Sequence, residues 1–259
     1  MPLDFFYKIC YNIYIEKLRK RRIFMILTNE KIEFLYRFFD KVFEGMGECL
    51  YISNCDTGLT DLMTSLEYQT VVDYSQIEGG EFEGVKFDGF FGCTKAVFLF
   101  EGWDIVIKIP FNGNYCFDPD TGKPVFTDIP NHIVMENQIY EDASDEMQEI
   151  LLKNEYLFNY NDLEIYAQIA IAETENERVH SILAPELLDK VQAARDSRPF
   201  GYKCPCNDFL AAVMLQHPDT YEDIFDELCN IEDMHNDNYG YLANGMAVIH
   251  DYAGYSEIY

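Results

Sequence analysis

The sequence lacks the features that place a chain in or across a membrane. It has no run of eighteen apolar residues, and its N-terminus has neither the long apolar core nor the small-residue cleavage site of a secretory signal peptide. No internal repeat and no low-complexity segment is present, which excludes solenoid and fibrous architectures. We therefore expect a cytoplasmic protein, without membrane contact, that forms one large or two small globular domains.

Positive charge is scarce. The 259 residues include 19 Lys and Arg against 46 Asp and Glu, which gives a formal net charge of -27. Seven of the basic residues fall within residues 1–31, so the rest of the chain is more acidic still. A strongly negative surface repels nucleic acid and anionic lipid, and it favours cations and basic partner proteins. No direct nucleic-acid binding is expected.

Closely spaced cysteines are almost absent. The eight cysteines are scattered, and only Cys204 and Cys206 stand near each other. A structural zinc site needs four ligands, and no second pair with suitable spacing exists. Reduced thiols of a cytoplasmic protein are therefore expected.

The apolar content of 48% and the aromatic content of 15% are sufficient for a sizeable core. Periodicity and turn residues predict the order of the elements. We expect helices at 29–44, 59–67, 143–153, 159–172, 208–216 and 219–230, and strands at 68–74, 85–91, 95–100, 104–110 and 182–188, with a hairpin turn at 118–123 and a turn at 79–80.

The segment 231–255 carries the strongest functional pattern. Asp233 and Asn238 stand five residues apart, and Asp251 follows Asn238 by thirteen. Phosphoryl transfer needs a carboxylate near the attacking hydroxyl, together with a carboxamide and a second carboxylate that hold magnesium against the phosphates. An Asn- and Asp-rich turn followed by an ordinary strand is the alternative interpretation, since turns favour these residues.

This spacing resembles the catalytic and metal-binding loops of the protein-kinase-like superfamily, which includes protein kinases and aminoglycoside phosphotransferases. There the pattern is H-R-D-x-x-x-x-N followed by D-F-G. The resemblance implies that Asp233 is the catalytic base and that Asn238 and Asp251 bind Mg. The sequence departs from the pattern at Ile231 and Glu232, which replace the histidine and the arginine.

The apolar strand around Lys108 resembles the V-A-I-K strand of that superfamily. A lysine within an apolar strand needs a partner, because burying a lone ammonium group is costly. The resemblance implies that Lys108 contacts the ATP phosphates and is oriented by a glutamate on the next helix. Glu164 is the candidate, with Glu146 and Glu149 as alternatives. The other interpretation places Lys108 on the wet face of an edge strand.

Gly89 and Gly92 precede this strand and retain part of the glycine-rich loop, G-x-G-x-x-G-x-V, that covers the phosphates in kinases. Glycine suits such a loop because it lets the backbone approach the phosphates closely. The resemblance implies that both glycines contribute to nucleotide binding. An ordinary β-turn with glycines is the alternative.

The resemblance implies an α+β fold with a kinase-like antiparallel small-lobe sheet, a reduced and mainly helical large lobe, and a helical N-terminal extension. The expected divisions are residues 1–80 for the extension, 81–190 for the small lobe with an insertion at 111–153, and 191–259 for the truncated large lobe. The chain ends eight residues after Asp251 and so leaves no room for a kinase substrate platform.

The implied function is that of a phosphotransferase that uses Mg and ATP on an unidentified small molecule or protein. The alternative is a weak or inactive pseudokinase-like binding protein, including an acidic mimic of nucleic acid that blocks a basic partner protein. By analogy, a compact acidic chain of this kind suits a phage or mobile element.

Overall fold

The structure is a computed structural model that divides into two compact units, residues 1–44 and 45–259, which we describe separately. The expected divisions after residues 80 and 190 stay predictions. The described residues are 27–43, 52–55, 62–64, 70–72, 79–92, 94–111, 113–117, 120–121, 124–161, 163–175, 177, 183–200, 204–231 and 234–253.

In the first unit, helix α2 (Asn29–Val42) confirms the predicted N-terminal helix. The Oγ1 of Thr28 accepts a hydrogen bond from the backbone N–H of Lys31 at 3.3 Å, which satisfies one of the unpaired donors at the start of the helix. Phe34 and Phe38 are one helical turn apart and stack with their ring centroids 6.4 Å apart. Phe34, Leu35, Phe38 and Phe39 are the buried residues of this helix.

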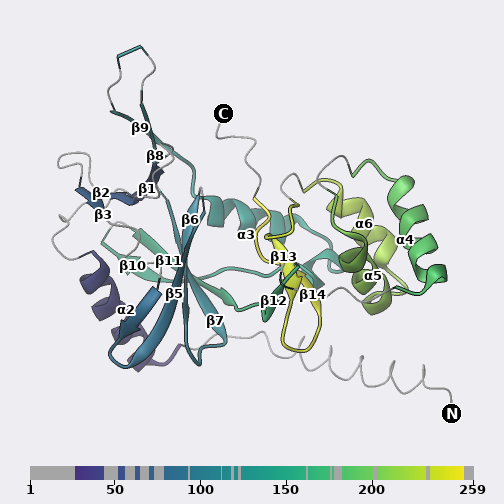
Figure 1. Cartoon of the computed structure of the whole chain (residues 1–259), viewed down its shortest axis with the longest axis horizontal. Coiled ribbons are helices and arrows are strands. Elements are labelled where there is room, and N and C mark those ends of the chain that lie inside the picture. The colour runs from purple at the N-terminus through teal and green to yellow at the C-terminus, as the bar shows by residue number, and fades with distance from the viewer. Residues whose placement is uncertain are drawn as a thin grey trace. The chain divides into compact units, whose positions relative to one another are not determined.

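A six-stranded sheet is the largest element of the second unit (Figure 1). All of its neighbouring strands are antiparallel, in the order β10-β11-β7-β6-β5-β4. The predicted strands at 85–91, 95–100 and 104–110 are confirmed. The strands are β4 (Gly79–Phe82), β5 (Val85–Phe91), β6 (Lys95–Phe100), β7 (Ile105–Pro110), β10 (Glu155–Tyr160) and β11 (Leu163–Ile169).

Strand β7 lies in the interior of this sheet, between β6 and β11. Ile105, Ile107 and Ile109 are buried on one of its faces, and Lys108 is buried on the other with 2% of its surface exposed. A strand that is covered on both faces usually has an almost continuous run of apolar residues, and β7 has such a sequence. The edge-strand interpretation of Lys108 is therefore wrong.

A second sheet has the order β3-β2-β1-β8-β9. The predicted strand at 68–74 and the hairpin around 118–123 are confirmed, because β8 and β9 pair antiparallel across that turn. The predicted helix at 59–67 is wrong at its centre, where β2 pairs with both β1 and β3. The strands are β1 (Ile52–Cys55), β2 (Leu62–Thr64), β3 (Thr70–Val72), β8 (Gly113–Phe117) and β9 (Pro124–Asp128).

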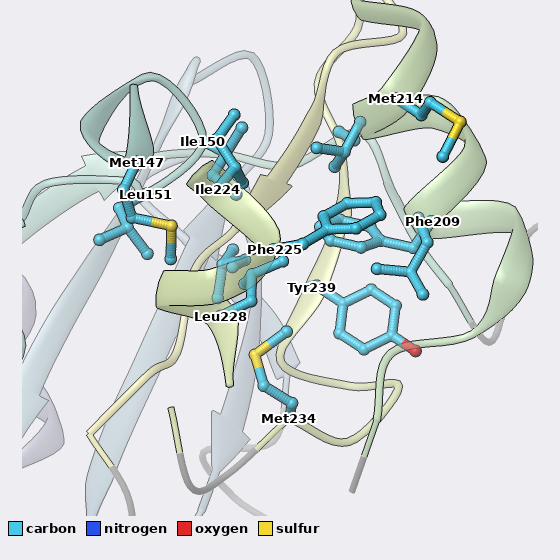
Figure 2. Packing of buried hydrophobic residues seen from close by; sticks show 14 of the residues in the cluster. Met147, Ile150, Leu151, Phe209, Met214, Ile224, Phe225, Leu228, Met234 and Tyr239 are labelled. Carbon is cyan, nitrogen blue, oxygen red and sulfur yellow. The ribbon is translucent and has the colours of Figure 1, made fainter. Parts of the chain in front are cut away.

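The C-terminal part is mainly helical and has its own core, shown in Figure 2. Phe209, Phe225 and Tyr239 are fully buried there. None of the described helices is long and apolar enough to cross a membrane. The elements are α3 (His132–Asp142), the 3-10 turn η2 (Met147–Glu149), α4 (Pro185–Asp196), α5 (Asn207–Gln216), α6 (Tyr221–Leu228) and the small sheet of β12 (Glu173–Thr174), β13 (Tyr239–Tyr241) and β14 (Ala247–Ile249).

The helices α5 and α6 confirm the predictions at 208–216 and 219–230, but four other predictions in this unit are wrong. Residues 159–172 form the hairpin β10–β11, and residues 143–153 hold only η2. Residues 79–80 begin strand β4 rather than a turn. Helix α4 begins at Pro185 within the predicted strand 182–188, because proline suits the first turn of a helix.

A stability prediction follows from the close packing of β13 against β12. A Cβ added to Gly240 would lie 2.4 Å from the carbonyl oxygen of Glu173 and 3.1 Å from the Cα of Thr174. Because backbone atoms cannot swing aside, Gly240→Ala is expected to lower the free energy of unfolding by about 1–3 kcal/mol. Urea denaturation measures this. Gly92→Ala is the control, since its Cβ would meet only the Lys95 carbonyl, at 3.7 Å. Equal unfolding midpoints for the two variants would contradict the prediction.

Candidate functional site

Helix α3 supplies the centre of the site. Its N-cap is Asn131, whose Oδ1 accepts hydrogen bonds from the backbone N–H groups of Ile133 at 3.0 Å and Val134 at 3.2 Å. This cap fixes where the helix begins and so directs Glu136, one turn later, into the protein interior. The side chain of Glu136 is fully buried.

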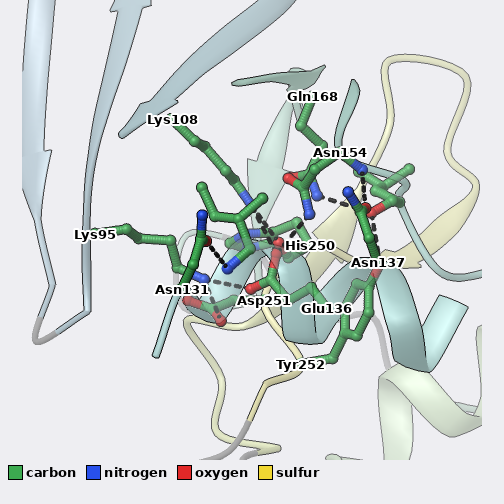
Figure 3. Close-up of polar contacts among 12 residues, drawn as sticks. Lys95, Lys108, Asn131, Glu136, Asn137, Asn154, Gln168, His250, Asp251 and Tyr252 are labelled. Atoms are coloured by element: carbon green, nitrogen blue, oxygen red, sulfur yellow. Dashed lines mark hydrogen bonds and ion pairs between the residues drawn. The ribbon is translucent and has the colours of Figure 1, made fainter. Parts of the chain in front are cut away.

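The Glu136 carboxylate is satisfied on both oxygens (Figure 3). Its Oε1 accepts a hydrogen bond from the Nζ of Lys95 in an ion pair. Its Oε2 accepts one from the Nδ2 of Asn154 at 2.6 Å and lies 3.6 Å from the Nζ of Lys108. A buried carboxylate is tolerated only with such partners, so two strands and a loop are held to α3 through one side chain.

Asp251 forms the other acidic side of the cluster. Its Oδ1 accepts a hydrogen bond from the Nζ of Lys95 at 2.8 Å. The carbonyl oxygen of Asn238 accepts from the backbone N–H groups of His250 at 2.9 Å and Asp251 at 3.3 Å. This ties the segment after β14 to the loop before β13. The Asp251 side chain is 27% exposed, so its carboxylate is open to ligands in a way that Glu136 is not.

Lys108 reaches the same place from β7. Its Nζ donates a hydrogen bond to the carbonyl oxygen of His250 at 2.7 Å. The structure therefore brings Lys108 to the segment of Asp251 and ties the backbone of Asn238 to the same segment. The metal-binding role of Asn238 and Asp251 stays a prediction. The candidate base, Asp233, lies outside the described residues.

The two lysines differ in their acidity. Burial lowers the pKa of Lys95, but the carboxylates of Asp251 and Glu136 outweigh it and raise this pKa above its ordinary value. Burial lowers the pKa of Lys108 to about 8, with only partial compensation by Glu136. The pKa of Asp251 is lowered because Lys95 and Lys108 outweigh the effect of burial. Lys95 and Asp251 therefore form the firmly charged pair.

His250 stands beside this pair and is neutral. Burial, reinforced by the nearby charges of Lys108 and Lys95, lowers the pKa of its imidazole to about 3. It therefore adds no positive charge at physiological pH.

The prediction that Glu164 orients Lys108 is corrected by the contacts. Glu164 is on strand β11, and its Oε2 accepts hydrogen bonds from the Nδ2 of Asn131 at 2.6 Å and the phenol of Tyr166 at 2.7 Å. The carboxylate beside Lys108 is that of Glu136. Of the two alternatives, Glu149 has another partner: its Oε2 lies 3.2 Å from the Nδ1 of His217.

Sequence reasoning missed Glu136, Lys95 and Asn154. A signal for α3 was available in Asn131, which follows a proline and is a favoured N-cap residue. No sequence pattern marked Lys95, because its place in the site depends on how its strand pairs in the sheet.

The two glycines differ in position. Gly89 is buried within β5, opposite Phe98 of β6. Gly92 is exposed in the turn that follows, and its backbone N–H donates to the carbonyl oxygen of Lys95 at 3.0 Å. The β5–β6 turn therefore lies directly before Lys95. A role for either glycine in nucleotide binding stays a prediction.

Binding of magnesium and a nucleotide stays a prediction, which the donor chemistry of two residues allows. Asp251 and Asn238 carry hard oxygen donors, which magnesium prefers. Magnesium bound with nucleotides commonly takes one or two protein carboxylates and completes its shell with phosphate and water. Among the described residues, no group of three or more His, Cys, Asp or Glu is arranged to hold a metal ion by itself.

Comparisons with known proteins give no relative from which a function could be inferred. No known protein family matches the chain, and no curated protein and no solved structure matches it.

Proposed function

We propose that this chain is a kinase-like phosphotransferase that uses Mg and ATP. The observation that carries the proposal is a cluster of two buried lysines, a buried glutamate and the partly exposed Asp251. It joins the neighbouring strands β6 and β7 to α3 and to the segment after β14, which lie farther along the sequence. Buried charges are costly, so three of them beside a partly exposed aspartate favour a functional site over a structural one.

The order of the elements supports this proposal. Lys108 lies on β7, the last of the four consecutive antiparallel strands β4 to β7, and Glu136 lies on α3, the first helix that follows them. In protein kinases an ion pair between a lysine on the third strand and a glutamate on the following helix must form for activity. The 3.6 Å separation between Lys108 Nζ and Glu136 Oε2 corresponds to that pair.

Each candidate residue has a distinct task in the proposal. Asp251 and Asn238 hold magnesium, which neutralises charge that develops on the phosphates. Asp233 accepts the proton of the attacking hydroxyl group. A lysine of the cluster supplies the phosphates with positive charge that the fold has already positioned, which is how electrostatic catalysis gains its strength. The acceptor is a small molecule or a protein.

The alternative function is a catalytically inactive binding protein. The observation that favours it is the direct contact of Lys95 with Asp251, through which the protein itself supplies a cation to its candidate metal ligand. Two departures from the kinase loop also favour this function: Ile231 replaces the histidine, and Glu232 replaces the arginine. In this case the strongly acidic chain acts on a basic partner protein, in one version by mimicking nucleic acid.

A thermal-shift experiment tests nucleotide binding. A ligand at 100 times its dissociation constant stabilises the folded state by about 2.7 kcal/mol, so millimolar ATP with magnesium is expected to raise the Tm of the parent chain by several degrees. Asp251→Asn removes the charged metal ligand and should abolish the magnesium-dependent part of that shift. Asp223→Asn, at an exposed position on α6, is the matched control and should keep the shift. Absence of any shift in the parent chain would favour the inactive binding protein.

A further inference from the structure

We propose that Lys95, rather than Lys108, is the lysine that contacts the nucleotide phosphates, and that Lys108 is a structural tie beneath it. This assignment rests on the proposed function, since it names which of two candidate side chains meets the ligand. The sequence pattern points to Lys108, and the contacts of the two side chains point to Lys95.

The two lysines share one face of the sheet. Lys95 pairs with Pro110, and Lys108 pairs with Val97, two residues farther along β6. Directly paired residues of antiparallel strands point to the same side, and so do residues two apart in one strand. Lys95 and Lys108 are therefore diagonal neighbours. Lys95 is the one that begins its strand, next to the exposed turn at Gly92.

The hydrogen-bond acceptors of the two ammonium groups differ in whether they can move away. Lys108 donates to the backbone carbonyl of His250, which cannot leave without moving the end of β14. Lys95 donates to the side-chain carboxylate of Asp251, which is partly exposed. A ligand that reaches Asp251 therefore meets the ammonium group of Lys95 directly, whereas Lys108 is engaged with the main chain.

The charge of Asp251 can be balanced either by Lys95 or by a bound cation, so Lys95 can exchange this partner for another. In the structure, Lys95 supplies the positive charge beside Asp251. If Asp251 held a divalent cation, that cation would supply the positive charge, and one of the three donors of the Lys95 ammonium group would be free for an anionic phosphate oxygen. The ion pair with Glu136 keeps Lys95 positioned while this exchange takes place. Lys108 has no corresponding exchange, because its other partner is a neutral carbonyl group.

The test compares Lys95→Met with Lys108→Met by calorimetric titration with Mg-ATP and with adenosine. A lost phosphate contact weakens binding of ATP and leaves adenosine unaffected, whereas a structural defect weakens both. Lys95→Met is expected to weaken Mg-ATP binding by about 10- to 100-fold, the usual range for a charge-assisted hydrogen bond, with adenosine affinity unchanged. Lys108→Met is expected to change the two affinities by the same factor and to lower the Tm.

Charge-balanced double variants cover the case in which a single variant fails to fold. Lys95→Met with Glu136→Gln leaves Lys108 and Asp251 charged, and Lys108→Met with Glu136→Gln leaves Lys95 and Asp251 charged. The same discrimination between ATP and adenosine is expected for these doubles. If the selective loss of ATP affinity follows Lys108, or neither lysine, the assignment is overturned while the proposed function stands. If the parent chain binds neither ligand, the proposed function falls, and the assignment falls with it.

Discussion

Glu136→Ala is expected to lower the free energy of unfolding by about 3–5 kcal/mol, because it leaves two buried ammonium groups without their shared carboxylate. Lys95 keeps its contact with Asp251, but Lys108 keeps only a carbonyl group. The Nδ2 of Asn154 also loses its acceptor in a buried position. The desolvation cost of Lys108 and of the Asn154 amide is then less well offset than in the parent chain. Chemical denaturation monitored by circular dichroism measures the change.

Glu164→Ala is the matched control, since it removes the glutamate that the sequence favours as the lysine partner. Its hydrogen bonds go to the side chains of Asn131 and Tyr166, neither of which is a cation. Glu164 is also only half-buried, so water can replace it there. We expect a loss of about 1 kcal/mol. A larger loss for Glu164→Ala than for Glu136→Ala would mean that Glu136 is not the residue that holds the cluster together.

Local signals in the sequence were sufficient for the strands that carry the lysines. The runs of β6 and β7 are apolar, rich in β-branched or aromatic residues, and separated by a turn at Gly102, whose φ of 76° suits glycine. These strands depend on residues close together in the sequence. The approach of Lys108 to the segment of Asp251 was predicted only by the resemblance to the kinase-like superfamily, since 142 residues separate Lys108 from its acceptor His250.

The helix that carries Glu136 was not predictable from periodicity. A buried glutamate and a buried histidine occupy positions of α3 where a helix normally shows apolar residues, so its apolar face is interrupted. Conversely, β11 is buried on both faces, and its apolar residues at Leu163, Tyr166 and Ile169 matched the period of a helix. In both cases the packing of other elements, rather than local preference, decided the structure.

Lys95 was missed for a different reason. Its partners are 41 and 156 residues away, and nothing near Lys95 in the sequence indicates them. A lysine at the start of a strand is usually solvent-exposed, and here it is 3% exposed. Only the antiparallel pairing of β6 with β7 and the return of the chain after β14 bring it to the site.

Asp233→Ala is expected to reduce the release of phosphate from ATP by about 10²- to 10⁴-fold, the usual contribution of a general base. The parent rate itself should be slow. The side chain of Ile231 cannot form the hydrogen bonds of the histidine that it replaces, and the negative charge of Glu232 repels the phosphates. A residue that acts mainly in the transition state affects kcat and leaves nucleotide affinity nearly unchanged. Steady-state phosphate release and a titration with Mg-ATP measure the two quantities.

The neighbouring carboxylate provides the control for this prediction. Glu232→Gln removes a like charge from the same loop, and it is expected to leave the rate unchanged or to raise it. Unchanged turnover in Asp233→Ala would show that Asp233 is not the base. Absence of phosphate release by the parent chain, with Mg-ATP binding retained, would assign the chain to the inactive binding proteins. In that case Lys95, Glu136 and Asp251 hold a nucleotide as a structural ligand, because their contacts do not depend on turnover.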